Sequence, residues 1–162
     1  MKKVLIIGGT GYIGGRLSSY LNTNGFEVII GTSKKLSHLP VQLSNYKSYY
    51  IDLASKDSLL VACEGVDIII HLASPNAKES FEYPKLAYEV NTLGTENLIN
   101  ASIEKKVKYF LYFSTAHVYG VPLSGKVSED TIPKPLHPYS ITHRLAEDFI
   151  IKAINNKKIN VS

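Results

Sequence analysis

The stretch "GGTGYIGG" at residues 8–15 contains five glycines in eight residues, and it decides the fold predicted for this chain. Directly before it, the apolar run at residues 3–7 is typical of a buried β-strand. Within and after it, Ile13, Leu17 and Leu21 recur every four residues, as on one face of a helix. The stretch is therefore predicted to be a tight turn that connects a strand to a helix.

The spacing of these glycines indicates what the turn binds. Gly9, Gly11 and Gly14 fit the pattern G-x-G-x-x-G, and Gly8, Gly11 and Gly14 also lie three residues apart. In a dinucleotide-binding fold, such glycines form a tight turn, let a pyrophosphate approach the backbone and allow close packing of helix on strand. The N-terminus of the helix offers free N–H groups and a partial positive charge to the phosphates. We therefore predict a dinucleotide site; the alternative is a glycine-rich turn without a ligand.

Short runs of β-branched and aromatic residues alternate with helical patterns along the chain. The expected strands cover residues 3–7, 26–30, 48–51, 66–70 and 109–114. The expected helices run from the glycines to Asn24-Gly25 and over residues 55–62 (with Ser55 as N-cap), 79–105 and 139–156. This alternation predicts an α/β fold with a Rossmann-like doubly wound parallel sheet in three layers, α/β/α. Residues 120–138, rich in proline, predict an irregular loop, and residues 159–162 predict the start of a sixth strand, at which the chain stops.

Composition excludes several classes of protein. The chain has 162 residues, about one domain, and its 44% hydrophobic and 20% charged residues are ordinary globular values. The 18 Lys and Arg exceed the 14 Asp and Glu by four, but they form no arginine-rich stripe, so we expect no nucleic-acid partner. No apolar run reaches the roughly 18 residues of a membrane span, so we expect a cytoplasmic protein without membrane association. The single cysteine, Cys63, excludes an internal disulfide and a cysteine-rich metal site, and we expect no metal.

The residues after the second expected strand bear on the choice of dinucleotide. Many NAD sites carry an acidic residue about 20 residues beyond the glycines, where it holds the ribose 2′-hydroxyl. Here Thr32 stands in that place, followed by Ser33, Lys34 and Lys35. Two hydroxyls and two ammonium groups suit a 2′-phosphate, so the sequence favours NADP, with NAD as the alternative. The competing interpretation is that the two lysines are ordinary solvated charges.

Six separated motifs, in this order along the chain, resemble those of a known family. They are "GGTGYIGG", Asp52-Leu53, "HLAS" at 71–74, "VNTLGTENLINA" at 90–101, "FSTAHVYG" at 113–120 and "PYSITHRLAE" at 138–147. The chain is similar along nearly its whole length to the N-terminal part of an extended short-chain dehydrogenase/reductase. Within that group it resembles the NAD-dependent epimerase/dehydratase family, which acts on nucleotide sugars.

The resemblance implies roles for residues in these motifs. Asp52 and Leu53 are expected to border the adenine, Ala73 to lie along the cofactor, and Asn91 to support the active-site helix through a backbone contact. Alternatively, Asp52 is a turn former and Asn91 a polar helix residue. The full expected cofactor-binding set is Gly8, Thr10, Gly11, Tyr12, Ile13, Gly14, Thr32, Ser33, Lys34, Asp52, Leu53, Leu72, Ala73, Ser74, Asn91, Tyr139 and His143.

The resemblance also places the catalytic residues at Thr115, Tyr139 and His143. In the family, a Ser or Thr hydroxyl and a Tyr address the reacting oxygen while hydride moves to or from the nicotinamide. A Lys four residues after the Tyr supplies the positive charge that favours the phenolate. Here that position holds His143, and an imidazole is mostly neutral at pH 7. We therefore expect weakened or lost catalysis unless Arg144 substitutes; the alternative is that His143 is an exposed residue without a role.

Two further departures narrow the function. Ala116 and His117 follow Thr115, where the family's 4,6-dehydratases carry an Asp-Glu pair, so epimerisation or carbonyl reduction remains. Family members also continue into a substrate domain, so residues 1–162 are expected to form an incomplete dinucleotide-binding domain with the substrate domain absent. A homodimer through the helices at 79–105 and 139–156 is expected by resemblance. Two hypotheses remain: an epimerase or reductase acting on a nucleotide sugar, or a non-catalytic dinucleotide-binding module.

Overall fold

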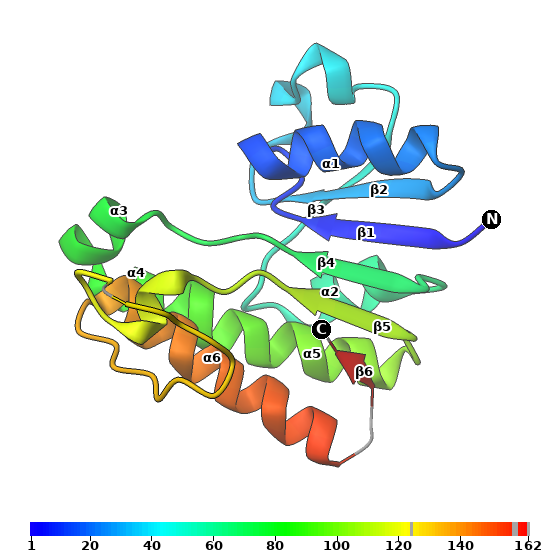
Figure 1. Cartoon of the computed structure of the whole chain (residues 1–162). Helices are drawn as coiled ribbons and strands as arrows, with labels where there is room; N and C mark the ends of the chain where they lie inside the picture. The colour runs from blue at the N-terminus through cyan, green and yellow to red at the C-terminus, as the bar shows by residue number, and fades with distance from the viewer. Residues whose placement is uncertain (124, 157–158, 162) are drawn as a thin grey trace.

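A parallel sheet forms the centre of the molecule. The computed structural model describes residues 1–123, 125–156 and 159–161 (Figure 1). Across these residues, six parallel strands lie in the order β3-β2-β1-β4-β5-β6. The strands are β1 (Lys3–Ile7), β2 (Glu27–Thr32), β3 (Lys47–Tyr50), β4 (Ile68–His71), β5 (Tyr109–Tyr112) and β6 (Asn160–Val161). The predicted Rossmann-like, doubly wound sheet is confirmed.

Helices connect the strands and lie on both faces of the sheet. The α-helices are α1 (Tyr12–Thr23), α2 (Lys56–Cys63), α3 (Ala77–Glu82), α4 (Pro84–Ala87), α5 (Gly94–Glu104) and α6 (Pro138–Asn155). A π-helix, η3 (Tyr88–Leu93), joins α4 to α5. Short 3₁₀ turns are η1 (Leu36–His38), η2 (Val41–Leu43) and η4 (Ala116–Tyr119).

The core is divided between the two faces of the sheet. On one face, Val4 and Ile6 of β1 pack with Leu17 and Leu21 of α1. On the other face, alternate residues of the strands pack against α2, α5 and α6, which lie together on that side (Figure 1). Because successive side chains of a strand point to opposite faces, the apolar runs noted in the sequence supply both cores. The three layers are those predicted.

The expected single helix over residues 79–105 is wrong. Tyr83 interrupts it with φ −130° and ψ 67°, because the following Pro84 disfavours helical geometry in the residue before it. Before the break, Asn76 and Glu79 form a capping box that starts α3. After it, the chain passes through the π-helix into α5. The periodic apolar residues concealed these breaks.

Other boundaries differ by a few residues. β2 ends two residues later than expected, and β5 ends at Tyr112 rather than at residue 114. Ser55 caps α2 as predicted, since its side chain accepts a hydrogen bond from Ser58 N. Residues 120–137 contain no helix or strand where the structure describes them, as expected for a loop, and α6 begins at Pro138, the last residue of the expected loop. The last residue of the expected sixth strand, Ser162, lies outside the described residues.

The turn between β1 and α1 brings two stretches of backbone into contact. A Cβ on Gly14 would lie 2.6 Å from Gly8 O and 2.7 Å from Gly9 Cα, closer than atoms approach in proteins. Gly8 itself has φ +83°, and a Cβ there would lie 2.8 Å from Ala73 N. The backbone of α1 therefore lies directly on the end of β1, as the glycine spacing predicts.

We predict that Gly14→Ala lowers the free energy of unfolding by about 2 kcal/mol or more, because backbone atoms on both sides cannot give way. Urea denaturation measures the change. Gly15→Ala is the matched control in the same helix, since a Cβ there meets nothing within 4 Å. The control should leave stability unchanged or raise it by up to about 1 kcal/mol, because Ala favours a helix over Gly. Equal effects of the two variants would contradict the close contact.

Candidate functional site

A cleft of about 710 Å³ lies at the carboxyl ends of the strands. It sits where β1 and β4 are neighbours and their connections leave to opposite faces of the sheet, which is where ligands bind in open α/β folds. Five separate segments line it: Ile7, Gly8, Thr10 and Gly11; Thr32, Ser33 and Lys34; Tyr50 to Ala54; Leu72 to Pro75; and Glu79, Tyr83, Leu86, Glu89 and Val90. Most of the expected cofactor residues are thus brought together.

The N-terminus of α1 borders this cleft and has free donors. Gly11 is the N-cap residue, and within the described part of the chain no side chain caps the helix. The N–H groups of Tyr12, Ile13 and Gly14 therefore remain available to an anion. The side chains of Tyr12 and Ile13 are exposed, whereas Gly14 is buried against the β1 turn. None of these three lines the cleft, so any contact with a ligand there would come through backbone.

The end of β2 holds polar groups without a carboxylate. The Thr32 hydroxyl lies 3.1 Å from the Thr10 hydroxyl and accepts a hydrogen bond from Lys34 N, also at 3.1 Å. Thr32 is buried. Ser33 and Lys34 are exposed on the cleft wall. The Ser33 hydroxyl and the Lys34 ammonium group are therefore the groups accessible to a ligand.

Asp52 and Leu53 follow β3 and shape the next part of the wall. Asp52 Oδ1 accepts a hydrogen bond from Ala54 N at 2.9 Å, so the side chain forms a local turn. The turn-former interpretation of Asp52 thus describes part of its role. Leu53 packs against Gly94, where a Cβ would lie 3.0 Å from its side chain, and Leu53 O accepts from Asn97 Nδ2 at 3.0 Å.

Asn91 lies in the π-helix and outside the cleft. It is buried, and its Nδ2 donates to Thr142 Oγ1 of α6 at 3.0 Å. The neighbouring Thr92 Oγ1 donates to Thr142 O at 3.0 Å. The backbone contact between these elements is therefore made by Thr92, while Asn91 bonds through its side chain. Together they fasten α6 to η3.

Tyr139 and Thr115 carry hydroxyl groups without hydrogen-bond partners from other elements where the structure describes their surroundings. Tyr139 is half-buried in the first turn of α6, and Thr115 precedes η4, where its Oγ1 accepts from His117 N at 3.3 Å. The Tyr139 ring meets His117 edge-on at 6.0 Å between centroids and His143 at 4.6 Å. The packing of η4 on α6 thus brings Tyr139 and His143 next to the turn that follows Thr115.

His143 is buried rather than exposed, which rules out the interpretation as a surface residue. Its Nδ1 lies 2.7 Å from Tyr112 Oη and its Nε2 lies 3.1 Å from Ser74 Oγ. Desolvation lowers the pKa of His143 to about 4, so the ring is neutral at pH 7. It therefore supplies no positive charge to Tyr139.

Arg144 does not take over that charge. Its guanidinium donates to Glu147 Oε2 at 3.2 Å and to Asp148 Oδ1 at 2.6 Å. Glu147 also accepts a hydrogen bond from Ser114. Two carboxylates thus neutralise the arginine.

Sequence reasoning missed several residues of this region. Tyr112 ends β5 and contacts His143, and Thr142 receives the contacts from η3. His71 ends β4 with Nε2 3.0 Å from Thr95 Oγ1, and desolvation lowers its pKa to about 3. The available signal was position alone: Tyr112 lies in the second half of the expected strand at 109–114 and His71 directly follows the expected strand at 66–70, near the edge of the sheet where sites form.

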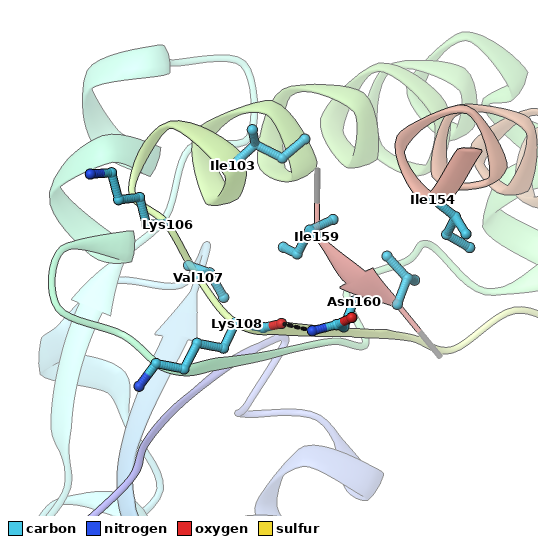
Figure 2. A pocket seen from close by; sticks show the side chains of 8 residues that line it. Ile103, Lys106, Val107, Lys108, Ile154, Ile159 and Asn160 are labelled. Atoms are coloured by element: carbon cyan, nitrogen blue, oxygen red, sulfur yellow. Dashed lines mark hydrogen bonds between the residues drawn. The ribbon is translucent and has the colours of Figure 1, made fainter. Parts of the chain in front are cut away.

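A second hollow, of about 680 Å³, lies beside β6 and the residues that lead into β5 (Figure 2). Its walls include Ile103, Val107, Ile154 and Ile159, and Asn160 Nδ2 donates to Lys108 O at 3.2 Å. It lies at the amino end of β5, opposite the carboxyl edge, and contains none of the predicted site residues. We therefore place the candidate site in the first cleft.

Two classes of feature are not found in the described part of the chain. It contains no group of three or more His, Cys, Asp or Glu side chains placed to hold a metal ion. No helix over the same residues is long and apolar enough to cross a membrane.

The strand order, the glycine turn and the cleft beside β1 and β4 together define a Rossmann-like dinucleotide-binding fold of the short-chain dehydrogenase/reductase type. The sequence profile of the NAD dependent epimerase/dehydratase family matches residues 4–162, and the chain belongs to that family.

Individual relatives agree with this assignment. The UDP-glucose 4-epimerase of Lactobacillus helveticus is 32% identical over 150 residues, which cover 90% of this chain and 45% of the relative. The solved structure of MoeE5 in complex with UDP-glucuronic acid and NAD is similar with a TM-score of 0.86 at 27% identity, over 99% of this chain and 52% of that one. UDP-glucose 4-epimerase from Thermus thermophilus, in complex with NAD, has a TM-score of 0.86 at 27% identity, over 98% and 53%. The chain thus spans about half the length of these proteins.

We predict that the protein loses stability as pH falls from about 7 toward 4. His143 and His71 have folded pKa values of about 4 and about 3, below the ordinary 6.5, so the unfolded chain binds more protons in this range. Each histidine contributes a slope of at most about 1.4 kcal/mol per pH unit. Urea denaturation at several pH values measures it. His143→Gln should flatten the dependence, whereas the exposed control His38→Gln should not; equal slopes in all three proteins would contradict the buried neutral ring.

Proposed function

We propose that the cleft binds a nicotinamide dinucleotide and that the chain carries the cofactor site and catalytic hydroxyls of an epimerase or reductase acting on a nucleotide sugar. The observation that carries this proposal is the glycine turn at the end of β1. Gly8 and Gly14 leave no room for a Cβ, and the first N–H groups of α1 stand uncapped beside the cleft. This cradle fits a pyrophosphate.

The lining residues suggest how the rest of the cofactor would be held. The N–H groups of Tyr12, Ile13 and Gly14 would bind the pyrophosphate, and Asp52 and Leu53 would border the adenine. Leu72, Ala73 and Ser74, at the end of β4, would lie along the cofactor toward the nicotinamide. When bound, a nicotinamide dinucleotide supplies a hydride acceptor or donor. A cleft of about 710 Å³ is of the size that such ligands occupy.

Thr115 and Tyr139 would address the reacting oxygen of the substrate. Neither hydroxyl is bonded to another element where the structure describes it, so each is free to donate to or accept from a ligand. Tyr139 would move the proton at that oxygen, while Thr115 would orient it. His143 is neutral and Arg144 is paired with carboxylates, so neither supplies a positive charge to Tyr139, and we expect slow proton transfer at neutral pH.

The substrate class is supported by the names of similar proteins. These names include UDP-glucose and UDP-glucuronic acid as the sugars acted on or bound. We propose a nucleotide sugar for this chain as well. We also propose a homodimer through the helices within residues 79–105 and 139–156. In the second of these segments, α6 exposes Ile141, Leu145 and Ile151. The incomplete domain organisation and the cytoplasmic location inferred from the sequence stay predictions.

A specific observation favours a second candidate, a dinucleotide-binding module without turnover. Neither His143 nor Arg144 presents a free positive charge to Tyr139, since one is neutral and the other is paired with two carboxylates. Binding through backbone N–H groups needs no such charge. The two candidates therefore share the cofactor cleft and differ only at Tyr139.

We predict that the phosphate preference depends on Lys34. Similar solved structures contain NAD, and this argues for NAD as the cofactor of this chain. The end of β2 carries Ser33 and Lys34 and no carboxylate, and this argues for NADP. If NADP is the cofactor, Lys34→Ala should weaken NADPH binding about tenfold and NADH binding less than about twofold, because one charge-assisted contact is lost. Fluorescence titration measures both affinities, with Lys152→Ala at the far end of α6 as control. Tighter binding of NADH than of NADPH by the unchanged chain would show the NADP prediction to be wrong.

We predict that Tyr139→Phe lowers turnover of UDP-glucose by about 100-fold or more, because it removes the group that transfers the proton. Formation of UDP-galactose, or oxidation of NAD(P)H with a keto-sugar, is followed by chromatography and absorbance. NADH and NADPH affinities should change less than about twofold, and Tyr20→Phe, exposed on α1, serves as control. No turnover by the unchanged chain, with dinucleotide binding intact, would favour the binding module instead.

A further inference from the structure

Ser74, His143 and Tyr112 form a continuous chain of hydrogen bonds from the cleft into the interior. Ser74 lies on the cleft wall just after β4, and its hydroxyl donates to Pro75 O at 2.7 Å. A serine hydroxyl has one proton, so that donation leaves Ser74 Oγ only as an acceptor. His143 Nε2, 3.1 Å away, must therefore be the donor.

This assignment determines the other side of the imidazole. A neutral ring carries one proton, and with that proton on Nε2 the opposite nitrogen is an acceptor. Tyr112 Oη, 2.7 Å from His143 Nδ1, is then the donor. Both ring nitrogens are thus satisfied inside the protein, and neither is left to contact a ligand.

The surroundings of His143 keep it in this neutral state. Its hydrogen-bond and ring partners include Tyr112 of β5, Tyr139 of α6 and Ser74 after β4, and the charged form of His71 in β4 would repel it. None of these is acidic, and desolvation is the cause of its lowered pKa. The nearby Glu147 is engaged by Arg144 and Ser114 instead.

We propose that His143 is a positioning residue that acts on a bound dinucleotide through Ser74. Ser74 Oγ donates to Pro75 O and accepts from His143, which leaves one lone pair directed to a ligand donor. A hydroxyl of the nicotinamide ribose, or the carboxamide N–H₂, is the kind of donor that such an acceptor binds. His143 fixes the direction of that lone pair, and Tyr112 fixes the ring of His143. The inference rests on the proposed binding of a dinucleotide in the cleft.

Dinucleotide titrations of four variants test the inference. Ser74→Ala and His143→Leu should each weaken NADH and NADPH binding about fivefold, the effect of one hydrogen bond. The double variant should bind no worse than Ser74→Ala alone, since His143 acts only through Ser74. His143→Gln keeps an N–H donor in the place of Nε2 and should restore affinity to within about twofold. Ser44→Ala, whose hydroxyl also donates to a backbone carbonyl but lies outside the cleft, is the control.

Several outcomes of these titrations are decisive. Unchanged affinity in Ser74→Ala, additive losses in the double variant, or no rescue by His143→Gln would each overturn the positioning role while the proposed function stands. No binding of either dinucleotide by the unchanged chain would overturn the proposed function, and the ligand role of Ser74 with it.

Nitrogen NMR of the unchanged chain tests the hydrogen-bond chain without any ligand having to bind. With ¹⁵N-labelled histidine, and with His143→Gln used only to assign the signal, His143 should be the neutral Nε2–H tautomer throughout the range from about pH 5.5 to about pH 8, because its pKa lies well below that range. A ring protonated on Nδ1, or one that titrates near neutral pH, would overturn the inference.

Discussion

The direct contact between the backbone of α1 and the end of β1 is the constraint on which the site depends. With no Cβ on Gly14, the helix lies on Gly8 O and Gly9, and its first N–H groups come to the edge of the sheet. The absence of a Cβ on Gly8 lets the chain after β4 approach at Ala73, which closes the cleft from the other side. A methyl group at either position would separate α1 from the sheet or β4 from the turn, and the cleft would lose its shape.

A second constraint holds the opposite side of the site. Asn91 and Thr92 of the π-helix bond to Thr142, so α6 is fastened next to the residues that follow β4. π-Helical turns are frequent at functional sites, and here the turn presents two consecutive polar side chains to one partner. That attachment places Tyr139 and His143, one helical turn apart, between η4 and the cleft wall. The same packing buries His143 and excludes water from it.

Much of the fold could be predicted because each strand and its turn are encoded locally. The aliphatic runs, the glycine turn, the Ser55 cap and the stop at Gly25 all depend on residues that are neighbours in sequence. The expected helix at 79–105 failed because apolar periodicity passes unchanged across Tyr83 and Pro84. At the site, the segments after β1 and β2 were predicted from the glycine spacing and from the residues about 20 positions beyond it, and those after β3 and β4 from the family resemblance. In the structure they meet because carboxyl ends of parallel strands share one edge. Tyr112 and Thr142 were not foreseen, because their partners lie in other elements.

The sequence by itself determined the order of strands and helices, the close contact at Gly14 and the family to which the chain belongs. It also placed His143 four residues after Tyr139, on the same side of a helix. Only the tertiary structure decided that this histidine is buried, neutral and bonded to Ser74 and Tyr112, and that Arg144 is paired with carboxylates. The physical reason is that helical spacing depends on near neighbours, whereas desolvation and hydrogen-bond partners come from β5 and from the loop after β4, which are distant in the chain.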